Sequence, residues 1–130
     1  MKYFTLKENH LFSKAYRNGE RAGGKYICVY ELPDYHAARL QRANPLKSRI
    51  NRVGITATKK LGAAVVRNRV KRILREAFYK ACRMYDIKTG RIIVISAKPA
   101  AVDVKTDDIY GELVPAMRKL GLIRGVKEDK

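Results

Sequence analysis

Residues 59–83 hold the densest set of side chains in this chain that could do chemistry. From Val66 to Arg83 the sequence carries seven basic residues and one acidic residue, Glu76. Guanidinium groups bind phosphate through paired hydrogen bonds and keep their charge near neutral pH, whereas lysine binds phosphate as a point charge. The segment therefore predicts binding of an anion such as phosphate.

A helix would gather these cations on one face. At about 100° per residue, the apolar residues from Val66 to Ala81 fall on one side of the helix. Arg67 and Arg69 flank the opposite face, whose polar members are Asn68, Lys71, Arg72, Arg75 and Tyr79. Like charges three and four residues apart repel each other, and a solvated surface helix usually mixes basic with acidic residues. We therefore expect this face to bind nucleic acid rather than solvent alone.

The rest of the chain offers little for catalysis by its own side chains. Its two histidines, His10 and His36, are too few and too dispersed to define an acid–base pair. Asp107, Asp108 and Glu112 could share one helical face and bind a metal, but the first two more simply complement a helix N-terminus. No glycine-rich phosphate loop, nucleophile elbow or zinc spacing is visible. We predict no catalytic residue and no metal site in the protein.

Hydrophobic periodicity predicts two further helices beside the cationic one. The first is expected over about 6–17, with Thr5 and Glu8 as its capping box and a glycine at its C-terminal end. The last is expected near 106–120, where Pro115 should kink or shorten it.

Three segments have the composition and alternation of β-strands. The third is nearly all apolar, as a central strand would be. The three expected strands are Tyr26–Leu32, Arg52–Thr58 and Arg91–Ala97. Between the first two, residues 33–51 form a polar, proline-containing stretch that indicates an insertion, with a short helix possible at His36–Ala43.

Composition limits the class of protein. A chain of 130 residues, 46% of them hydrophobic, is expected to form one domain with its own core. Its net charge of +17 indicates a polyanionic partner, and residues 53–98 alone carry 12 basic and 2 acidic groups. Cys28 and Cys82 lack the spacing of a disulfide framework or zinc site. With no apolar stretch long enough for a membrane span and no signal-peptide core, we expect a cytoplasmic protein.

The cationic segment resembles the signature of the protein subunit of bacterial ribonuclease P. The resemblance is carried by Lys59-Lys60-Leu61-Gly62, Val66-Arg67-Asn68-Arg69-Val70-Lys71-Arg72 and Arg75-Glu76-Ala77-Phe78. Other pieces follow in the family's order: Phe12 and Tyr16 on a first helix, Tyr30 on an aromatic strand, a Val53-Gly54 strand, and Ile92–Ala97 followed by Lys98-Pro99-Ala100. The similarity spans most of the chain.

This resemblance implies a fold and a function. The fold would be α+β, a two-layer α/β sandwich of about four strands and three main helices with a left-handed βαβ crossover. The protein would be an accessory to a catalytic RNA that uses Mg²⁺ to cleave precursor tRNA and leave the mature 5′ end. Its partners would be that RNA and the single-stranded 5′ leader of the precursor.

The resemblance also assigns roles to residues of this chain. Contacts with phosphates of the catalytic RNA or nearby substrate are expected from Lys59, Lys60, Arg67, Asn68, Arg69, Lys71, Arg72 and Arg75. Contacts with leader bases are expected from Phe12, Tyr16 and Tyr30, since aromatic stacking tolerates any base. Core packing is the alternative role for these three rings, most of all for Phe12.

The sequence departs from the family pattern in three places. Residues 33–51 are longer than the usual connection, and their cations either add an RNA contact or form a solvated loop; these cations are Arg39, Arg42, Lys47 and Arg49. Gly111 and Pro115 interrupt the last helix. Ala63 stands where a polar residue often precedes the motif helix, so the N-cap is unusual.

Two other classes of protein remain possible from composition alone. A ribosomal-type RNA-binding protein would have no part in a reaction, and the ordered Arg-Asn-Arg signature argues against it. A DNA-binding module would need a recognition helix with base-reading side chains rather than this dense array of phosphate-binding ones. The sequence does not indicate an oligomeric state.

Overall fold

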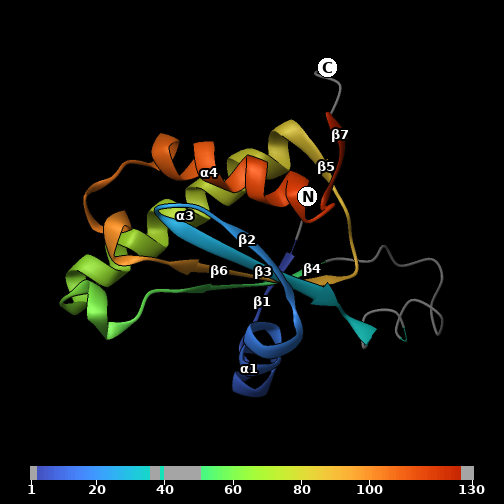
Figure 1. Ribbon diagram of the computed structural model, residues 1–130, viewed down its shortest axis with the longest axis horizontal. Helices are drawn as coiled ribbons and strands as arrows, with labels where there is room; N and C mark the ends of the chain where they lie inside the picture. The colour runs from blue at the N-terminus through green and yellow to red at the C-terminus, as the bar shows by residue number, and fades with distance from the viewer. Residues whose placement is uncertain (1–2, 36–38, 40–50, 127–130) are drawn as a thin grey trace.

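A five-stranded mixed sheet forms the centre of the computed structural model, which describes residues 3–35, 39 and 51–126 (Figure 1). The strand order is β1-β4-β6-β3-β2; β1 and β6 run parallel to β4, and β3 is antiparallel to both β6 and β2. The strands are β1 (Tyr3–Thr5), β2 (Glu20–Gly23), β3 (Ile27–Pro33), β4 (Asn51–Thr56) and β6 (Arg91–Ala97). A separate two-stranded sheet pairs β5 (Tyr85–Ile87) with β7 (Ile123–Val126).

Helices cover both faces of the main sheet (Figure 1). One face carries α1, and the other carries α3 and α4, which pack against each other. Their bounds are α1 (Asn9–Asn18), α3 (Ala64–Met84) and α4 (Thr106–Lys119), and the short 3₁₀ helices are η1 (Lys59–Leu61) and η2 (Pro99–Asp103). The predicted α+β class with three main helices is confirmed, and β1 extends the expected sheet of about four strands at its edge.

The alternation of side chains along the central strand β6 builds a core on each face. Ile93 and Ile95 belong to the larger core beneath α3 and α4, while Ile92 and Val94 belong to a smaller core beneath α1. Because α3 connects β4 to its parallel neighbour β6, the connection is the predicted βαβ crossover. Its left-handedness stays a prediction.

The prediction for the start of α1 is wrong, and of the two effects expected of Pro115 the shortening of α4 does not occur. Thr5 forms no capping box with Glu8, because Thr5 pairs with Val53 in the sheet and Glu8 itself is the N-cap of α1, with no side-chain capping bond. Pro115 does not shorten α4, which continues to Lys119, because the helix packs a buried apolar face on both sides of the proline. The predicted insertion and its short helix fall almost wholly outside the described residues.

Candidate nucleic-acid interface

Helix α3 has the two faces that its sequence predicts. Its buried side chains are Val70, Ile73, Leu74, Ala77, Phe78, Ala81 and Cys82. On the other side Asn68, Arg72, Arg75 and Tyr79 are exposed, and Lys71 is half-buried. Burial of the apolar face fixes the rotation of the helix, so the cations project together from a rigid support.

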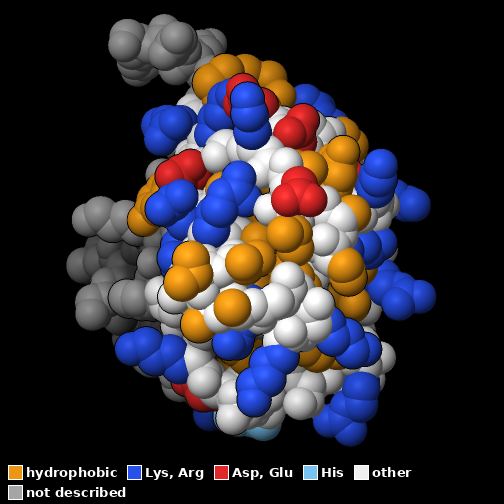
Figure 2. Space-filling model, turned by 90° about the vertical axis from the view of Figure 1, so that its left-hand side faces the viewer, with side chains coloured by type: hydrophobic (Ala, Val, Ile, Leu, Met, Phe, Trp, Pro, Cys, Tyr) orange, Lys and Arg blue, Asp and Glu red, His pale blue; other side chains and the backbone are white. Residues whose placement is uncertain are grey.

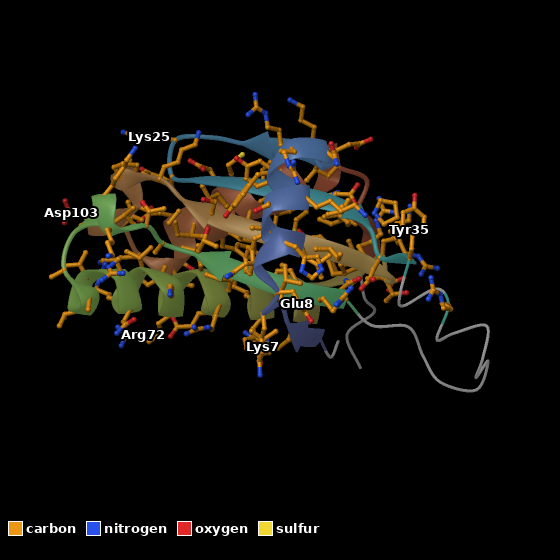
Figure 3. All side chains as sticks on the ribbon, turned by 90° about the horizontal axis from the view of Figure 1, so that it is seen from below. Lys7, Glu8, Lys25, Tyr35, Arg72 and Asp103 are labelled. Atoms are coloured by element: carbon orange, nitrogen blue, oxygen red, sulfur yellow. The ribbon has the colours of Figure 1, made fainter. Side chains whose placement is uncertain are left out.

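The exposed cations on this face have no acidic partner within the part of the chain that the structure describes. Glu76, the acid of the motif, accepts a hydrogen bond from the hydroxyl of Thr106 at 2.8 Å and so points toward α4. Among the described residues, no ion pair involves Lys71, Arg72 or Arg75. Figure 3 shows Arg72 directed away from the helix. Their charge is therefore available to an external anion.

Arg67 and Arg69 lie at the borders of this face and are both half-buried. The Nε atom of Arg67 is buried and has no hydrogen-bond acceptor within the described residues. Arg69 instead donates from Nη1 to the carbonyl of Val102 at 2.8 Å and from Nη2 to the carbonyl of Val104 at 3.1 Å. The two arginines of the Arg-Asn-Arg motif thus have different surroundings, and phosphate contact by either stays a prediction.

Lys59 and Lys60 are exposed on η1, immediately before α3. Gly62 joins η1 to α3 with a φ of 132°, a backbone conformation that residues other than glycine rarely adopt. The next residue, Ala63, is the N-cap of α3 and provides no side-chain capping bond. The glycine turn therefore brings both lysines beside the first turn of the motif helix, and their contact with RNA stays a prediction.

The other predicted contact residues lie on the α1 face of the sheet. The rings of Tyr16 and Tyr30 meet edge to face with their centroids 4.9 Å apart. The Tyr16 hydroxyl lies 3.2 Å from Oγ1 of Thr56. Burial, and then a hydrogen bond with the Cys28 side chain, raise the pKa of Tyr30 above its ordinary value. The raised pKa keeps the Tyr30 hydroxyl protonated near neutral pH, and 44% of Tyr16 is exposed.

Phe12 occupies a different place from the tyrosine pair. Its ring lies over Gly54 of β4, so closely that a Cβ on that glycine would collide with the ring. The ring is also part of the wall of a cleft of about 280 Å³ at the edge of β4, beyond the last β1 pair. The cleft is lined by Thr5, Leu6, Phe12, Val53, Ile55, Arg75 and Tyr79. Aromatic groups from α1 and α3 and a guanidinium from α3 therefore meet across one strand edge.

Two arginines that contribute to the net charge are neutralised inside the protein. Arg52 donates from Nε and Nη2 to the buried carboxylate of Asp34 at 2.7 and 2.8 Å, and this bond raises the pKa of Arg52. Arg91 donates from Nε to the buried Glu31 at 2.7 Å. Sequence reasoning missed both pairs. Each pair joins an acidic residue near the end of β3 to an arginine near the start of β4 or β6. The sequence shows these residues, but only the register of the strands shows that they meet.

The acidic residues considered for a metal have other partners. Asp107 pairs with Lys80 at 3.2 Å, and Asp108 accepts from the backbone NH of Lys105 at the start of α4. Glu112 accepts from the backbone NH groups of the turn before β3. No cluster of three or more His, Cys, Asp or Glu with metal-binding geometry occurs in the described parts of the chain.

Two further observations concern the class of protein. No helix in the described ranges has the length and apolar character of a membrane span. Cys28 lies in β3 and Cys82 in α3, and no disulfide joins them.

Comparison with known proteins identifies the family. The family model described as Ribonuclease P matches residues 1–121. The ribonuclease P protein component of Clostridioides difficile is 36% identical over 104 residues, covering 80% of each chain. That of Clostridium botulinum is 30% identical over 122 residues, covering 94% of this chain and 98% of the relative.

Solved structures agree with the sequence matches. The ribonuclease P protein of Staphylococcus aureus superposes with a TM-score of 0.72 at 25% identity, covering 95% of this chain and all of the other. The Thermotoga maritima protein shares the fold, with a TM-score of 0.65. These matches favour ribonuclease P over the ribosomal and DNA-binding alternatives. The chain belongs to the ribonuclease P protein family and is the accessory protein subunit of this tRNA-processing endoribonuclease.

Proposed function

We propose that the protein binds the ribonuclease P RNA through the cationic face of α3 and the 5′ leader of precursor tRNA through the cleft at the edge of β4. The observation that carries the second part is the meeting of Phe12, Arg75 and Tyr79 in that cleft. The protein would then place the leader beside the RNA that performs the cleavage.

Uncompensated charge supports the RNA-binding part. Repulsion between neighbouring cations costs a few tenths of a kcal/mol per pair, and binding of phosphate reverses that cost.

The cleft has the chemistry of a site for unpaired nucleotides. Single-stranded RNA is bound by stacking its bases on aromatic rings while cations follow the backbone. Phe12 and Tyr79 provide rings, and Arg75 provides a guanidinium between the cleft and the cationic face of α3. The Tyr16 and Tyr30 rings would extend this surface along the α1 face of the sheet. None of these groups reads one base in particular, which suits leaders of differing sequence.

Mg²⁺ belongs in this proposal to the RNA subunit. The carboxylates of Asp107, Asp108 and Glu112 are engaged by a lysine or by backbone NH groups. These bonds give each acid a structural role within the protein. The protein would assist cleavage by positioning RNA, and the metal would act together with the RNA.

The experiment compares precursor tRNA that has a long leader with precursor whose leader is a single nucleotide. Binding to the reconstituted holoenzyme is measured for Tyr79→Ala and for Phe12→Leu, which keeps an apolar side chain over Gly54. Because stacking contributes about 1–3 kcal/mol per base, each variant should bind the long leader on the order of tenfold more weakly. Binding of the short-leader precursor should not change.

Tyr35→Ala is the matched control, because Tyr35 is also an exposed tyrosine and does not line the cleft. It should bind both precursors as the unaltered protein does. Equal losses on both precursors, or no loss on either, would exclude leader binding in this cleft.

A further inference from the structure

Arg69 is the one residue of the Arg-Asn-Arg motif for which the structure shows internal hydrogen-bond acceptors. It lies four residues before the buried Ile73, on the border of the buried face of α3. Its two terminal nitrogens each donate to a backbone carbonyl, those of Val102 and Val104. Arg72, one turn later, has no such bond and points outward (Figure 3). Two arginines three residues apart are therefore placed for different tasks.

The carbonyls that Arg69 binds belong to the segment that links β6 to α4. In this segment, residues 98–105, Ala101 is buried whereas Lys98, Pro99 and Ala100 are exposed. The segment includes η2, which contacts both α3 and η1. It therefore lies at the end of the molecule where the motif helix begins, and Arg69 ties it to that helix.

This end of the molecule has a surface suited to RNA. Figure 2 shows apolar side chains gathered near its centre, with lysine and arginine side chains around them and several acidic side chains above. Val65 is 81% exposed, and Lys59, Lys60 and Lys98 are exposed on the neighbouring segments. Lys98 donates one of its three ammonium protons to the Gly24 carbonyl, which leaves two for an external acceptor.

We propose that Arg69 is a positioning residue: its guanidinium holds the 98–105 segment against α3, and the held segment contacts the RNA subunit through Lys98. This inference rests on the proposed function, in which α3 binds that RNA. It changes the expected role of Arg69: instead of contacting phosphate itself, Arg69 supports the contact that Lys98 makes. It also adds to the RNA interface a segment outside the motif.

The geometry requires arginine rather than any cation. Two carbonyls two residues apart along the backbone are each reached by a different nitrogen of one planar group. Lysine has a single ammonium on a flexible stem and does not reproduce this fork. Arg69→Lys therefore keeps the charge and loses the support, whereas Arg72→Lys keeps the charge on which a phosphate contact mainly depends.

The experiment measures binding of the RNA subunit over a range of salt concentrations for four variants: Arg69→Lys, Arg69→Ala, Arg72→Lys and Arg72→Ala. Acylation of Lys98 is measured in the same complexes by mass spectrometry. Arg69→Lys should bind RNA more weakly, on the order of tenfold, and should lose the protection that RNA gives Lys98. Because the Lys98 contact is then lost, its salt slope should fall by about 0.7–0.9 although the charge at position 69 is kept. Arg72→Lys should keep the salt slope and the protection of Lys98, and Arg72→Ala should lower the slope by about 0.7–0.9 with Lys98 still protected.

Three results would overturn the inference. They are wild-type affinity and Lys98 protection in Arg69→Lys, a fall in salt slope in Arg69→Ala while Lys98 stays protected, and no protection of Lys98 by RNA in the unaltered protein. The last result does not depend on whether a variant folds. Lys98→Gln adds an independent test, since it should lower the slope by one contact.

Failure of the proposed function would look different. If α3 did not bind the RNA, Arg72→Ala would leave the salt slope unchanged. If Arg72→Ala lowers the salt slope and Arg69→Ala lowers it with Lys98 still protected, only the positioning role of Arg69 is rejected.

Discussion

Arginine side chains have opposite roles in two regions of this molecule. In the central sheet, Arg52 and Arg91 bind the buried carboxylates of Asp34 and Glu31. On α3, Arg72 and Arg75 project into solvent and form no ion pair within the described residues. The first region uses charge to join strands, and the second leaves charge for an external anion. Net charge alone does not distinguish them, because both contribute to the total of +17.

The largest expected effect comes from breaking a buried pair. Asp34→Asn removes the carboxylate that binds Arg52, whose side chain is only 19% exposed. Loss of one partner of a buried pair destabilises a protein by about 3–5 kcal/mol, and we expect the lower end because Arg52 keeps some contact with water. Chemical denaturation measures this change. The salt slope of RNA binding by the folded protein should stay the same.

Asp86→Asn is the control for this prediction. Asp86 also pairs with an arginine, Arg124, but the atoms are 3.8 Å apart and both side chains are more than half exposed. Such surface pairs contribute about 0–1 kcal/mol. If Asp34→Asn were no more destabilising than Asp86→Asn, the Arg52 pair would have no structural role and the contrast between the two regions would fail.

A smaller effect on stability, with a larger effect on RNA binding, is expected for a substitution on α3. Arg75→Ala removes a cation that repels Lys71 and Arg72 at helical spacing, so the free energy of unfolding should stay within about 0.5 kcal/mol of the wild-type value or rise. The same variant should lower the salt slope of RNA binding by about 0.7–0.9. Denaturation and binding titrations on one preparation check both. A clear loss of stability without a change of slope would assign Arg75 to structure instead.

Periodicity was enough to predict the main elements of the fold. The expected strand Arg91–Ala97 matches β6, and the expected last helix near 106–120 matches α4 to within a residue. The short strands β1 and β2 were not predicted, because three or four residues carry too little alternation to be read. Their pairing with β4 and β3 is set by tertiary contacts rather than by local preference.

The candidate site was predictable in part. Helical spacing placed Lys71, Arg72 and Arg75 on one face, since a single helix fixes that relation. It could not show that Arg69 bonds to carbonyls 33 and 35 residues away, or that Tyr79 shares a cleft with Phe12 of another helix. Both facts depend on how α3 packs against distant segments. Sequence spacing within one helix therefore identified the charged face but not the neighbours of its edges.

The smallest expected effect tests the exposed member of the Arg52 network. Oε1 of Glu8 lies 3.7 Å from Nη1 of Arg52. The pKa of Glu8 is lowered below 4.5, mainly by a hydrogen bond from its own backbone NH; desolvation opposes this effect, and the backbone NH of Lys7 and the charge of Arg52 add to it. As pH falls below about 4.5, the Glu8 carboxylate is protonated in the unfolded chain before it is protonated in the folded protein. The stability that Glu8 contributes at neutral pH is therefore lost as pH falls through the lowered pKa of the folded state. Glu8→Gln should slightly reduce this acid-dependent loss, while Glu20→Gln, at an exposed carboxylate on β2, serves as the control in the same pH series of denaturation curves. An equal response of the two variants would mean that, in this network, only the buried carboxylate of Asp34 matters for folding, which would sharpen the division between structural and exposed charge.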